Sequence, residues 1–333
     1  MLQTFMRTTI GLDETVFLKY FLSDGVDFQN IDDMHFANFQ AGSLLTRVGR
    51  RLLRTQLSAD MVATVRRQID RGHARRAFIF NGRGFNNEIA TALEGLEHIT
   101  WFNPDFLRHA EHAHVERVAT RIISTKPADY NAKRYANCRP RDGIVHINPV
   151  IFSTDHEADL FLQSLRPNPI DQRPIDVGFL GNCSPSKRET IEELARLIKR
   201  RITVVGAGWR SNERVEALGP IYGPPLKAIF ENTKVGLAFP DIGDGVVDPI
   251  TVRYFQYPIL GTLPILQRNG LNRSILDPGL DAFCYENLVE AADRVEATLA
   301  MSRETYDASF RELAAFSVKS TLSAERVCRE LVL

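Results

Sequence analysis

The fold of this chain is decided by residues 176–209, which are DVGFLGNCSPSKRETIEELARLIKRRITVVGAGW. The apolar runs DVGFL and ITVV are each followed by glycine, and between them Ile191, Leu194 and Ile198 recur at helical spacing. Strand, turn and helix in this succession predict a parallel α/β sheet. Such a sheet binds its ligand in the crevice beyond the carboxyl ends of its strands.

The same alternation continues on both sides of this stretch. Toward the C-terminus we expect strands at 235–239 and 263–266 and helices at 225–233, 251–258, 286–301 and 309–331. Toward the N-terminus we expect strands at 77–80, 99–102, 121–124 and 143–147, with helices at 86–96 and 106–119. The sequence therefore predicts an α/β protein with two Rossmann-like domains that face each other across a cleft.

A proline-rich segment predicts the domain boundary. Residues 166–174 are RPNPIDQRP, and three prolines in so short a run cannot continue a helix or a central strand. We expect a first domain at 1–165 and a second domain at 175–308. The C-terminal helices of 309–333 are expected to pack back toward the first domain.

The composition is that of an ordinary soluble protein. The 41 basic residues balance 41 acidic ones, which does not favour nucleic acid as a partner. No apolar run approaches the ~18 residues of a membrane span, and the N-terminus lacks the apolar core of a signal peptide. The four cysteines are scattered without a C-x-x-C pair, which favours reduced thiols and a cytoplasmic location.

Basic residues are concentrated in one segment of the N-terminal half. Residues 44–76 hold nine arginines on two predicted amphipathic helices. A solvated helix face is one interpretation. Contact with the anionic inner leaflet of a membrane, or with a phosphorylated acceptor, is another. DNA modification rests on these arginines alone, and the zero net charge speaks against it.

The loop 181–188 has the features of a phosphate site. It leads into the amino end of a helix, where free N–H groups and the helix dipole favour anions. Lys187 and Arg188 lie in the first turn, where cations oppose the dipole unless an anion binds there. Two solvated cations are the alternative. Ser186 and Glu189 have capping-box spacing.

Two further motifs bear on the ligand. Gly206-Ala-Gly208 is not a complete dinucleotide fingerprint, which disfavours a nicotinamide enzyme. Pro249 is suited to the first position of a helix, which would place Asp248 and Gln256 near its amino end with Arg253 between them. Asp248 could equally be only the N-cap of that helix.

Four segments resemble a known family when taken in order: VGFLGNCSPSKRE (177–189), ITVVGAGW (202–209), GPPLKAIFENTKVGLAF (223–239) and VRYFQYPILGTLPIL (252–266). They are similar to the C-terminal domain of GT-B glycosyltransferases of the group 1 type, related to the spore-maturation protein CgeB. The resemblance covers about half of the chain. It implies transfer of a sugar from a nucleoside diphosphate sugar to an acceptor glycan or small molecule, without metal or cofactor.

The resemblance also implies roles for individual residues. Lys187 or Arg188, and more weakly Lys227, would neutralise the diphosphate, while Trp209 and Tyr222 would flank the base. Asp248 and Gln256 stand where the wider class has two carboxylates, for the donor sugar and for the ribose. The residues implied in donor binding are Gly181, Lys187, Arg188, Gly208, Trp209, Tyr222, Lys227, Asp248, Arg253 and Gln256.

The N-terminal half should contribute the acceptor side and a catalytic base. Gly82, Arg83 and Gly84 follow a predicted strand and would face the crevice. Asp105, Arg83 and His146 lie at predicted strand ends and are the candidates for the base, although His146 could instead be a buried histidine with its hydrogen bonds satisfied. The run His109-Ala-Glu-His112-Ala-His114-Val-Glu116 places only some of its side chains on one helix face, so no metal site is expected.

Asp248 and Gln256 differ from the two glutamates that the wider class has at the matching positions, and this difference leaves a second function open. An amide binds a ribose hydroxyl more weakly than a carboxylate does. A non-catalytic protein that binds nucleotide sugars or glycans on the same fold is therefore the alternative to a transferase.

Overall fold

The structure is a computed structural model of the whole chain. It describes residues 76–81, 85–104, 109–240, 242–243, 246–247, 250–270, 272–273, 276 and 278–332, together with the single positions 62, 63, 66, 67 and 70. Contacts divide the chain into unit 1, which is Met1–Asn148 with Glu325–Leu333, and unit 2, which is Pro149–Ala324. None of the helices in the described part of the chain has the length and apolar character that a bilayer crossing needs.

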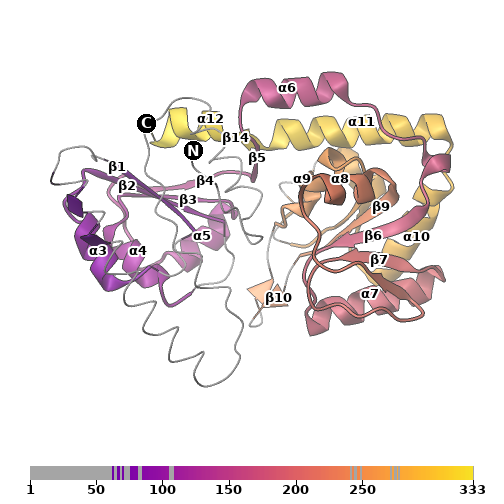
Figure 1. Cartoon of the computed structure of the whole chain (residues 1–333), viewed down its shortest axis with the longest axis horizontal. Helices are drawn as coiled ribbons and strands as arrows, with labels where there is room; N and C mark the ends of the chain where they lie inside the picture. Colours follow the sequence, from indigo (N-terminus) through magenta and orange to yellow (C-terminus); the bar gives the residue numbers. More distant parts are fainter. Residues whose placement is uncertain are drawn as a thin grey trace. The chain divides into compact units, whose positions relative to one another are not determined.

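Unit 1 is built on a parallel sheet of four strands in the order in which they occur along the chain. These are β1 (Arg76–Phe80), β2 (His98–Asn103), β3 (Arg121–Ser124) and β4 (Ile144–His146). Helices α3 (Asn87–Leu93), α4 (His112–Val118) and α5 (Ala128–Arg134) follow the first three strands (Figure 1). The core forms because Ile89 of α3, Trp101 of β2 and Val115 of α4 are buried together.

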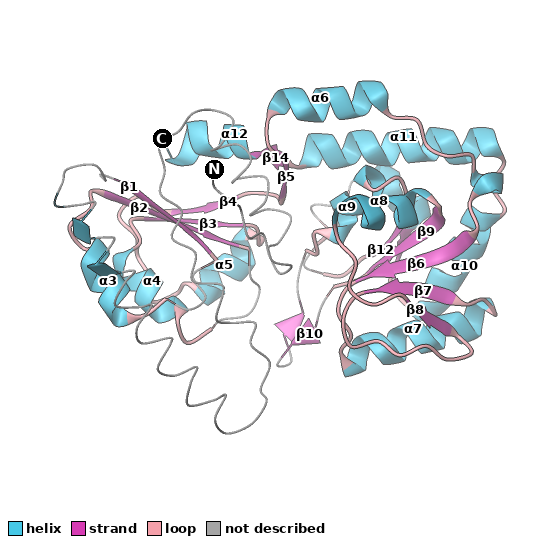
Figure 2. Ribbon diagram, in the orientation of Figure 1, coloured by secondary structure: helices cyan, strands magenta, loops and turns pink. Residues whose placement is uncertain are grey.

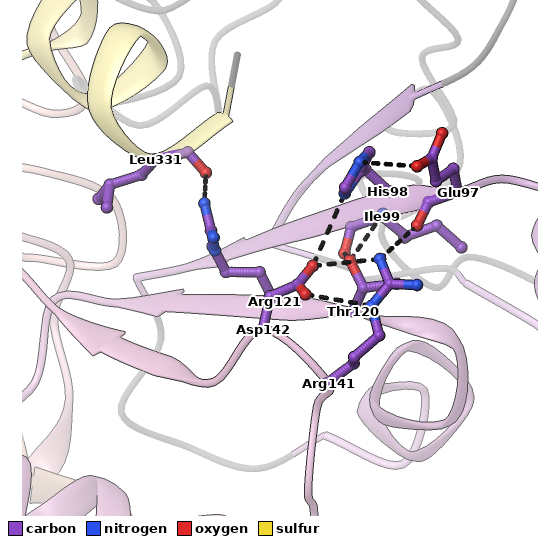
Figure 3. A network of polar contacts seen from close by, with 8 residues as sticks. All are labelled: Glu97, His98, Ile99, Thr120, Arg121, Arg141, Asp142 and Leu331. Atoms are coloured by element: carbon purple, nitrogen blue, oxygen red, sulfur yellow. Dashed lines mark hydrogen bonds and ion pairs between the residues drawn. The ribbon is translucent and has the colours of Figure 1, made fainter.

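The amino ends of these strands carry a polar network, shown in Figure 3. The Asp142 carboxylate accepts a hydrogen bond of 3.1 Å from Arg141 Nε, and His98 Nδ1 lies 3.7 Å from its other oxygen. The bond from Arg141 lowers the pKa of Asp142. Arg121, at the start of β3, donates to the carbonyl of Leu331, so the C-terminal residues belong to unit 1.

Unit 2 contains a parallel sheet of six strands in the order β13-β12-β9-β6-β7-β8. Their bounds are β6 (Ile175–Leu180), β7 (Ile202–Val205), β8 (Val215–Ala217), β9 (Thr233–Ala238), β12 (Leu263–Gln267) and β13 (Cys284–Tyr285). Strands β7 and β8 extend the sheet on one side of β6, and the later strands extend it on the other. The point where the order reverses lies between β6 and β9, and this is where such sheets bind ligands.

Helices cover this sheet in two packed pairs (Figure 2). Helix α7 (Pro185–Ile198) packs against α10 (Leu288–Leu299), and α9 (Arg253–Ile259) packs against α11 (Arg303–Ser320). The remaining helices are α6 (Asp155–Ser164), α8 (Gly223–Glu231), α12 (Ala324–Val327), the 3₁₀ turns Ile170–Gln172 and Pro278–Phe283, and a π-helical turn, Cys328–Val332. Short strands pair as β5 (Val150–Phe152) with β14 (Leu322–Ser323), and β10 (Ile242–Gly243) with β11 (Val246–Val247).

The predicted inward stripe of α7 is confirmed, since Ile191, Leu194 and Ile198 are all buried. Its predicted cap was wrong by two residues. Ser184, not Ser186, is the N-cap, and its hydroxyl accepts from the N–H of Lys187. Ser184 is preferred because Pro185 fits the first helical position, where no N–H is needed.

The boundary between the units differs from the one expected at 166–174. The division falls after Asn148, because β5 pairs with β14 and α6 packs on α11. The proline-rich segment is packed rather than a free linker. Arg173 within it is buried, and its guanidinium donates to the carbonyls of Asn168, Thr233 and Gly261 at 2.8, 2.7 and 2.6 Å.

Candidate functional site

Two loops meet at the carboxyl ends of β6 and β7. The N–H of Cys183 donates to the carbonyl of Ala207 at 2.8 Å, and the N–H of Ala207 donates to Asn182 Oδ1 at 2.9 Å. Glycine permits this approach, because a Cβ on Gly206 would lie 2.2 Å from the carbonyl oxygen of Gly181. The loops after two neighbouring strands therefore form one continuous surface.

The amino end of α7 presents two cations to this surface. Lys187 donates to the carbonyl of Asn182 at 3.3 Å, and the exposed Arg188 contacts Cys183 Sγ at 3.4 Å. That contact raises the pKa of Arg188 above its ordinary value. Both positive charges lie where the helix dipole disfavours them, so a bound anion would relieve their repulsion with the helix end. The structure thus places both cations at the amino end of α7, beside the loop 181–184.

A pocket of about 290 Å³ opens beside the same turn, lined by Cys183, Ser184, Pro185, Arg188, Glu189, Glu192 and Gly208. Its wall combines the Arg188 guanidinium with two carboxylates. Glu192 also accepts a hydrogen bond of 3.1 Å from the Asn212 amide. Such a wall suits a ligand that carries both negative charge and hydroxyl groups.

Trp209 is hydrogen-bonded to the start of the loop 181–188. Its indole N–H donates to the carbonyl of Gly181 at 2.7 Å, and its ring meets Phe179 edge-on at 5.8 Å. Tyr222 precedes α8 and is 50% exposed. The loop between β8 and α8 joins the surface through a bond of 2.9 Å from the N–H of Gly206 to the carbonyl of Gly219. The structure thus brings Gly181, Lys187, Arg188, Gly208 and Trp209 together.

Arg253 has a different place from the one predicted. Its side chain is only 7% exposed, and its guanidinium donates to the carbonyls of Phe239 at 2.9 Å and Leu180 at 3.3 Å. It also lies over the ring of Phe179, 5.3 Å from the centroid. Arg253 therefore joins the ends of β6 and β9.

The predicted helix start at Pro249 was wrong. Helix α9 begins at Arg253 with Val252 as its N-cap, so Asp248 is not its N-cap and does not share the helix with Gln256. The first backbone bonds of this turn run from the N–H groups of Tyr254 and Phe255 to the carbonyls of Thr251 and Val252. Gln256 is half-buried on α9. Asp248 itself lies outside the described residues.

Other predicted residues are separate from this surface or not described. Lys227 lies within α8 and pairs with Glu231 at 3.5 Å, and no contact in the described part of the chain links it to the phosphate loop. Asp105, Gly82, Arg83 and Gly84 lie outside the described residues. Of the arginine-rich segment 44–76, only residues 62, 63, 66, 67, 70 and 76 are described; the first five are helical and 76 begins β1.

Among the described histidines of unit 1, His98, His109 and His112 contact other side chains. His112 is buried, its ring meets Trp101 at 5.0 Å, and its Nδ1 lies 3.1 Å from Arg134 Nη2. Within the described ranges there is no group of three or more His, Cys, Asp or Glu side chains arranged to hold a metal. His146 ends β4, where burial lowers the pKa of its imidazole.

Two residues of the site were missed by the sequence. The Asn182 amide connects the two loops, and the buried Tyr257 hydroxyl bridges β6 and β9. Burial raises the pKa of Tyr257, so it is a neutral hydroxyl. An asparagine directly after a strand-ending glycine is a usable signal for Asn182. Tyr257 has none, because its partners are backbone atoms of distant strands.

The comparison with known proteins agrees with this geometry. Residues 185–325 match the model of a protein family described as glycosyl transferase-like. No curated protein sequence matches the chain.

Solved structures extend the likeness to both units. Anabaena HepE, crystallised with UDP and glucose, is 14% identical at a TM-score of 0.58, with 83% of this chain and 80% of that chain covered. The trehalose-phosphate synthase (UDP-forming) from Burkholderia xenovorans is 13% identical at 0.53, with 83% and 77% covered. Sucrose-phosphate synthase from Thermosynechococcus elongatus is 12% identical at 0.53, with 83% and 76% covered. The predicted GT-B fold, with two Rossmann-like domains, is confirmed.

Proposed function

We propose that the chain transfers a sugar from a nucleoside diphosphate sugar to an acceptor, and that the loop 181–184 and the first turn of α7 bind the diphosphate. The observation that carries this proposal is the pair of cations, Lys187 and Arg188, at the amino end of α7 beside the point where the strand order reverses. The match of 185–325 to a glycosyl transferase-like family supports the same chemistry.

The two cations have a role in the reaction as well as in binding. When the bond between the sugar and the diphosphate breaks, negative charge develops on the leaving group. Lys187, Arg188 and the dipole of α7 would stabilise that charge in place, so we propose that transfer needs no metal ion. Trp209 and Tyr222 would flank the base of the donor.

Uridine is the first nucleotide to test, because the HepE structures hold UDP or UDP-glucose. A hexose is the corresponding first choice of sugar. Gln256 would bind a ribose hydroxyl and Asp248 the donor sugar, which rests on the family resemblance alone. Asp105 is proposed as the base on the acceptor side.

The acceptor is proposed to be a glycan or small molecule bound with the help of residues 82–84. The scattered cysteines support a proposed cytoplasmic location, and the nine arginines of 44–76 support proposed contact with the anionic inner leaflet of a membrane. The relation to CgeB rests on the four quoted segments of unit 2.

Calorimetric titration tests the binding step. UDP, GDP and TDP are titrated into the protein, and one of them should bind with a micromolar dissociation constant. Lys187→Ala and Arg188→Ala should each weaken it about tenfold, the effect of one lost charge-assisted bond. Arg196→Ala is the matched control, because Arg196 is exposed on the same helix and pairs with Glu193. If none of the three nucleotides binds, the proposal is wrong.

The substitution of Asp248 and Gln256 for two carboxylates favours one alternative, a protein that binds nucleotide sugars without transfer. Release of UDP from UDP-glucose separates the two functions. A transferase should hydrolyse the donor slowly, and Asp248→Ala should abolish this release. Tight binding with no release over a broad acceptor panel would support the binding protein instead.

A further inference from the structure

The ladder between β6 and β9 ends before the strands do. The two strands pair as far as Gly178 and Gly236, where the reversal of strand order opens the crevice. Beyond that point both polar backbone groups of Leu180 are bonded to side chains of α9. Buried backbone groups need partners, and here one helix supplies them to two diverging strands.

Tyr257 makes the inner of these two connections. Its hydroxyl accepts from the N–H of Leu180 at 2.9 Å and donates to the carbonyl of Leu237 at 2.9 Å. The ring reaches this position because residue 236 is glycine, since a Cβ there would lie 2.8 Å from Tyr257 Cγ. One hydroxyl therefore takes the place of a ladder bond between β6 and β9.

Arg253, one turn earlier on α9, makes the outer connection. Its guanidinium joins the carbonyl of Leu180 to that of Phe239, at 3.3 and 2.9 Å. The rings of Phe179 and Phe239 stack at 4.7 Å beside it. Arg253 Nη1 is also 3.0 Å from the position that a Cβ on Gly181 would occupy, so the start of the phosphate loop rests against the guanidinium.

We propose that Arg253 and Tyr257 are positioning residues, which hold the ends of β6 and β9 at a set separation and thereby keep the loop 181–184 in the shape that binds diphosphate. The proposal rests on the proposed function for its ligand, but its structural part does not. A loop ordered before the ligand arrives pays less entropy on binding. Loss of either connection should therefore make the loop mobile and weaken binding through the loop.

Hydrogen–deuterium exchange on the full chain tests the structural part. Tyr257→Phe keeps the ring and removes only the hydroxyl, so the amides of 180–184 should exchange at least about tenfold faster. Tyr254→Phe is the matched control. Tyr254 is buried on the same helix, but its hydroxyl donates to the carbonyl of Gln267 at the end of β12. It should leave exchange at 180–184 unchanged.

Calorimetry with UDP tests the functional part. Both tyrosine variants lose one buried hydroxyl and should lower the melting temperature by similar amounts. Tyr257→Phe should in addition weaken UDP binding about five- to tenfold, while Tyr254→Phe should change it less than twofold. A purely structural role would make the two variants equal in affinity and in exchange, and that result would overturn the proposal.

Arg253 provides a second, independent pair of variants. Arg253→Met removes the bridge between Leu180 and Phe239, and Arg253→Lys keeps the charge and can restore one of the two bonds. Exchange at 180–184 should be fastest in the Met variant and intermediate in the Lys variant. Equal exchange in the wild type and both variants would contradict the proposal. If no nucleotide binds the wild type, the proposed function fails, and exchange still decides whether α9 holds the loop.

Discussion

In unit 1 the last residues of β2 and β3, Asn103 and Ser124, are buried and hydrogen-bonded to side chains, whereas in unit 2 the loop after β6 includes exposed residues. The Asn103 amide donates to the hydroxyl of Tyr135 at 2.7 Å, and Ser124 Oγ donates to Asn131 Oδ1 at 2.8 Å. Arg188, by contrast, is exposed beside a pocket. Among the described residues, the strand ends of unit 1 are thus packed, whereas those of unit 2 leave cations exposed at a helix start.

The difference lies in how each strand end satisfies its polar groups. Unit 1 uses neutral amides and hydroxyls that need no further partner. Unit 2 uses glycine, which brings two loops into backbone contact and leaves the helix end and its cations uncovered. A residue that follows a strand of a parallel sheet is therefore only a candidate for ligand binding. It stays a candidate when its polar groups are not already bonded to other residues of the protein.

Gly206→Ala should have the largest effect, because it disrupts the contact between the two loops of unit 2. A Cβ would lie 2.2 Å from the Gly181 carbonyl in a backbone conformation (φ +152°) that favours glycine, so the loops of unit 2 cannot keep their contact. We expect the free energy of unfolding to fall by about 3 kcal/mol or more in urea denaturation. Gly270→Ala is the control, because nothing lies within 4 Å of its Cβ. Equal stability of the two variants would refute the close packing of the loops.

Asn131→Ala should break the strand-end network of unit 1. Its amide donates to the carbonyl of Lys126 at 2.7 Å and accepts from Ser124, so truncation leaves buried groups unpaired. We expect a loss of about 2 kcal/mol in unfolding free energy. UDP affinity should stay within twofold, whereas a large change in affinity would show that this end also serves the ligand. Lys133→Ala, on the exposed face of the same helix, is the control.

A smaller effect of opposite sign is expected at Lys187. Replacing it by Gln removes a cation that opposes the dipole at the amino end of α7, so the unliganded protein should gain about 0.3–0.5 kcal/mol. The same variant should bind UDP more weakly, and the gain in thermal stability should disappear when UDP is added to both proteins. If Lys187→Gln is less stable than the wild type without ligand, the proposed repulsion between Lys187 and the helix dipole in the unliganded protein is contradicted.

The smallest effect concerns the amino ends of the unit 1 strands. The Arg141 hydrogen bond lowers the pKa of Asp142, so its ionised form stabilises the folded state. This contribution is complete above the unfolded pKa of about 3.9 and is lost as pH falls through the lower folded value. Asp142→Asn should therefore flatten the decline of unfolding free energy below about pH 4. An unchanged profile from pH 2 to 7 would rule out this coupling.

Much of the fold could be predicted from local pattern. The strands at 121–124 and 202–205 have the predicted bounds, and the apolar stripe of α7 is buried as expected. These elements follow from short apolar runs, glycine after strands and 3.6-residue spacing, all of which act between residues close in sequence. The phosphate loop could be found for the same reason, since its glycine, cap and cations lie within eight residues.

The rest depended on contacts between distant residues. The sequence by itself determined that an α/β domain at 176–267 presents Lys187 and Arg188 at a helix start, because local hydrogen bonding and hydrophobic periodicity specify both. Only the tertiary structure decided that Arg253 bridges two strand ends and that Tyr257 replaces a ladder bond. It also decided that the proline-rich segment is packed by Arg173. The partners in these cases are backbone carbonyls and amides. Because nearly every residue carries these groups, no pattern of side chains in the sequence could predict which of them are bonded.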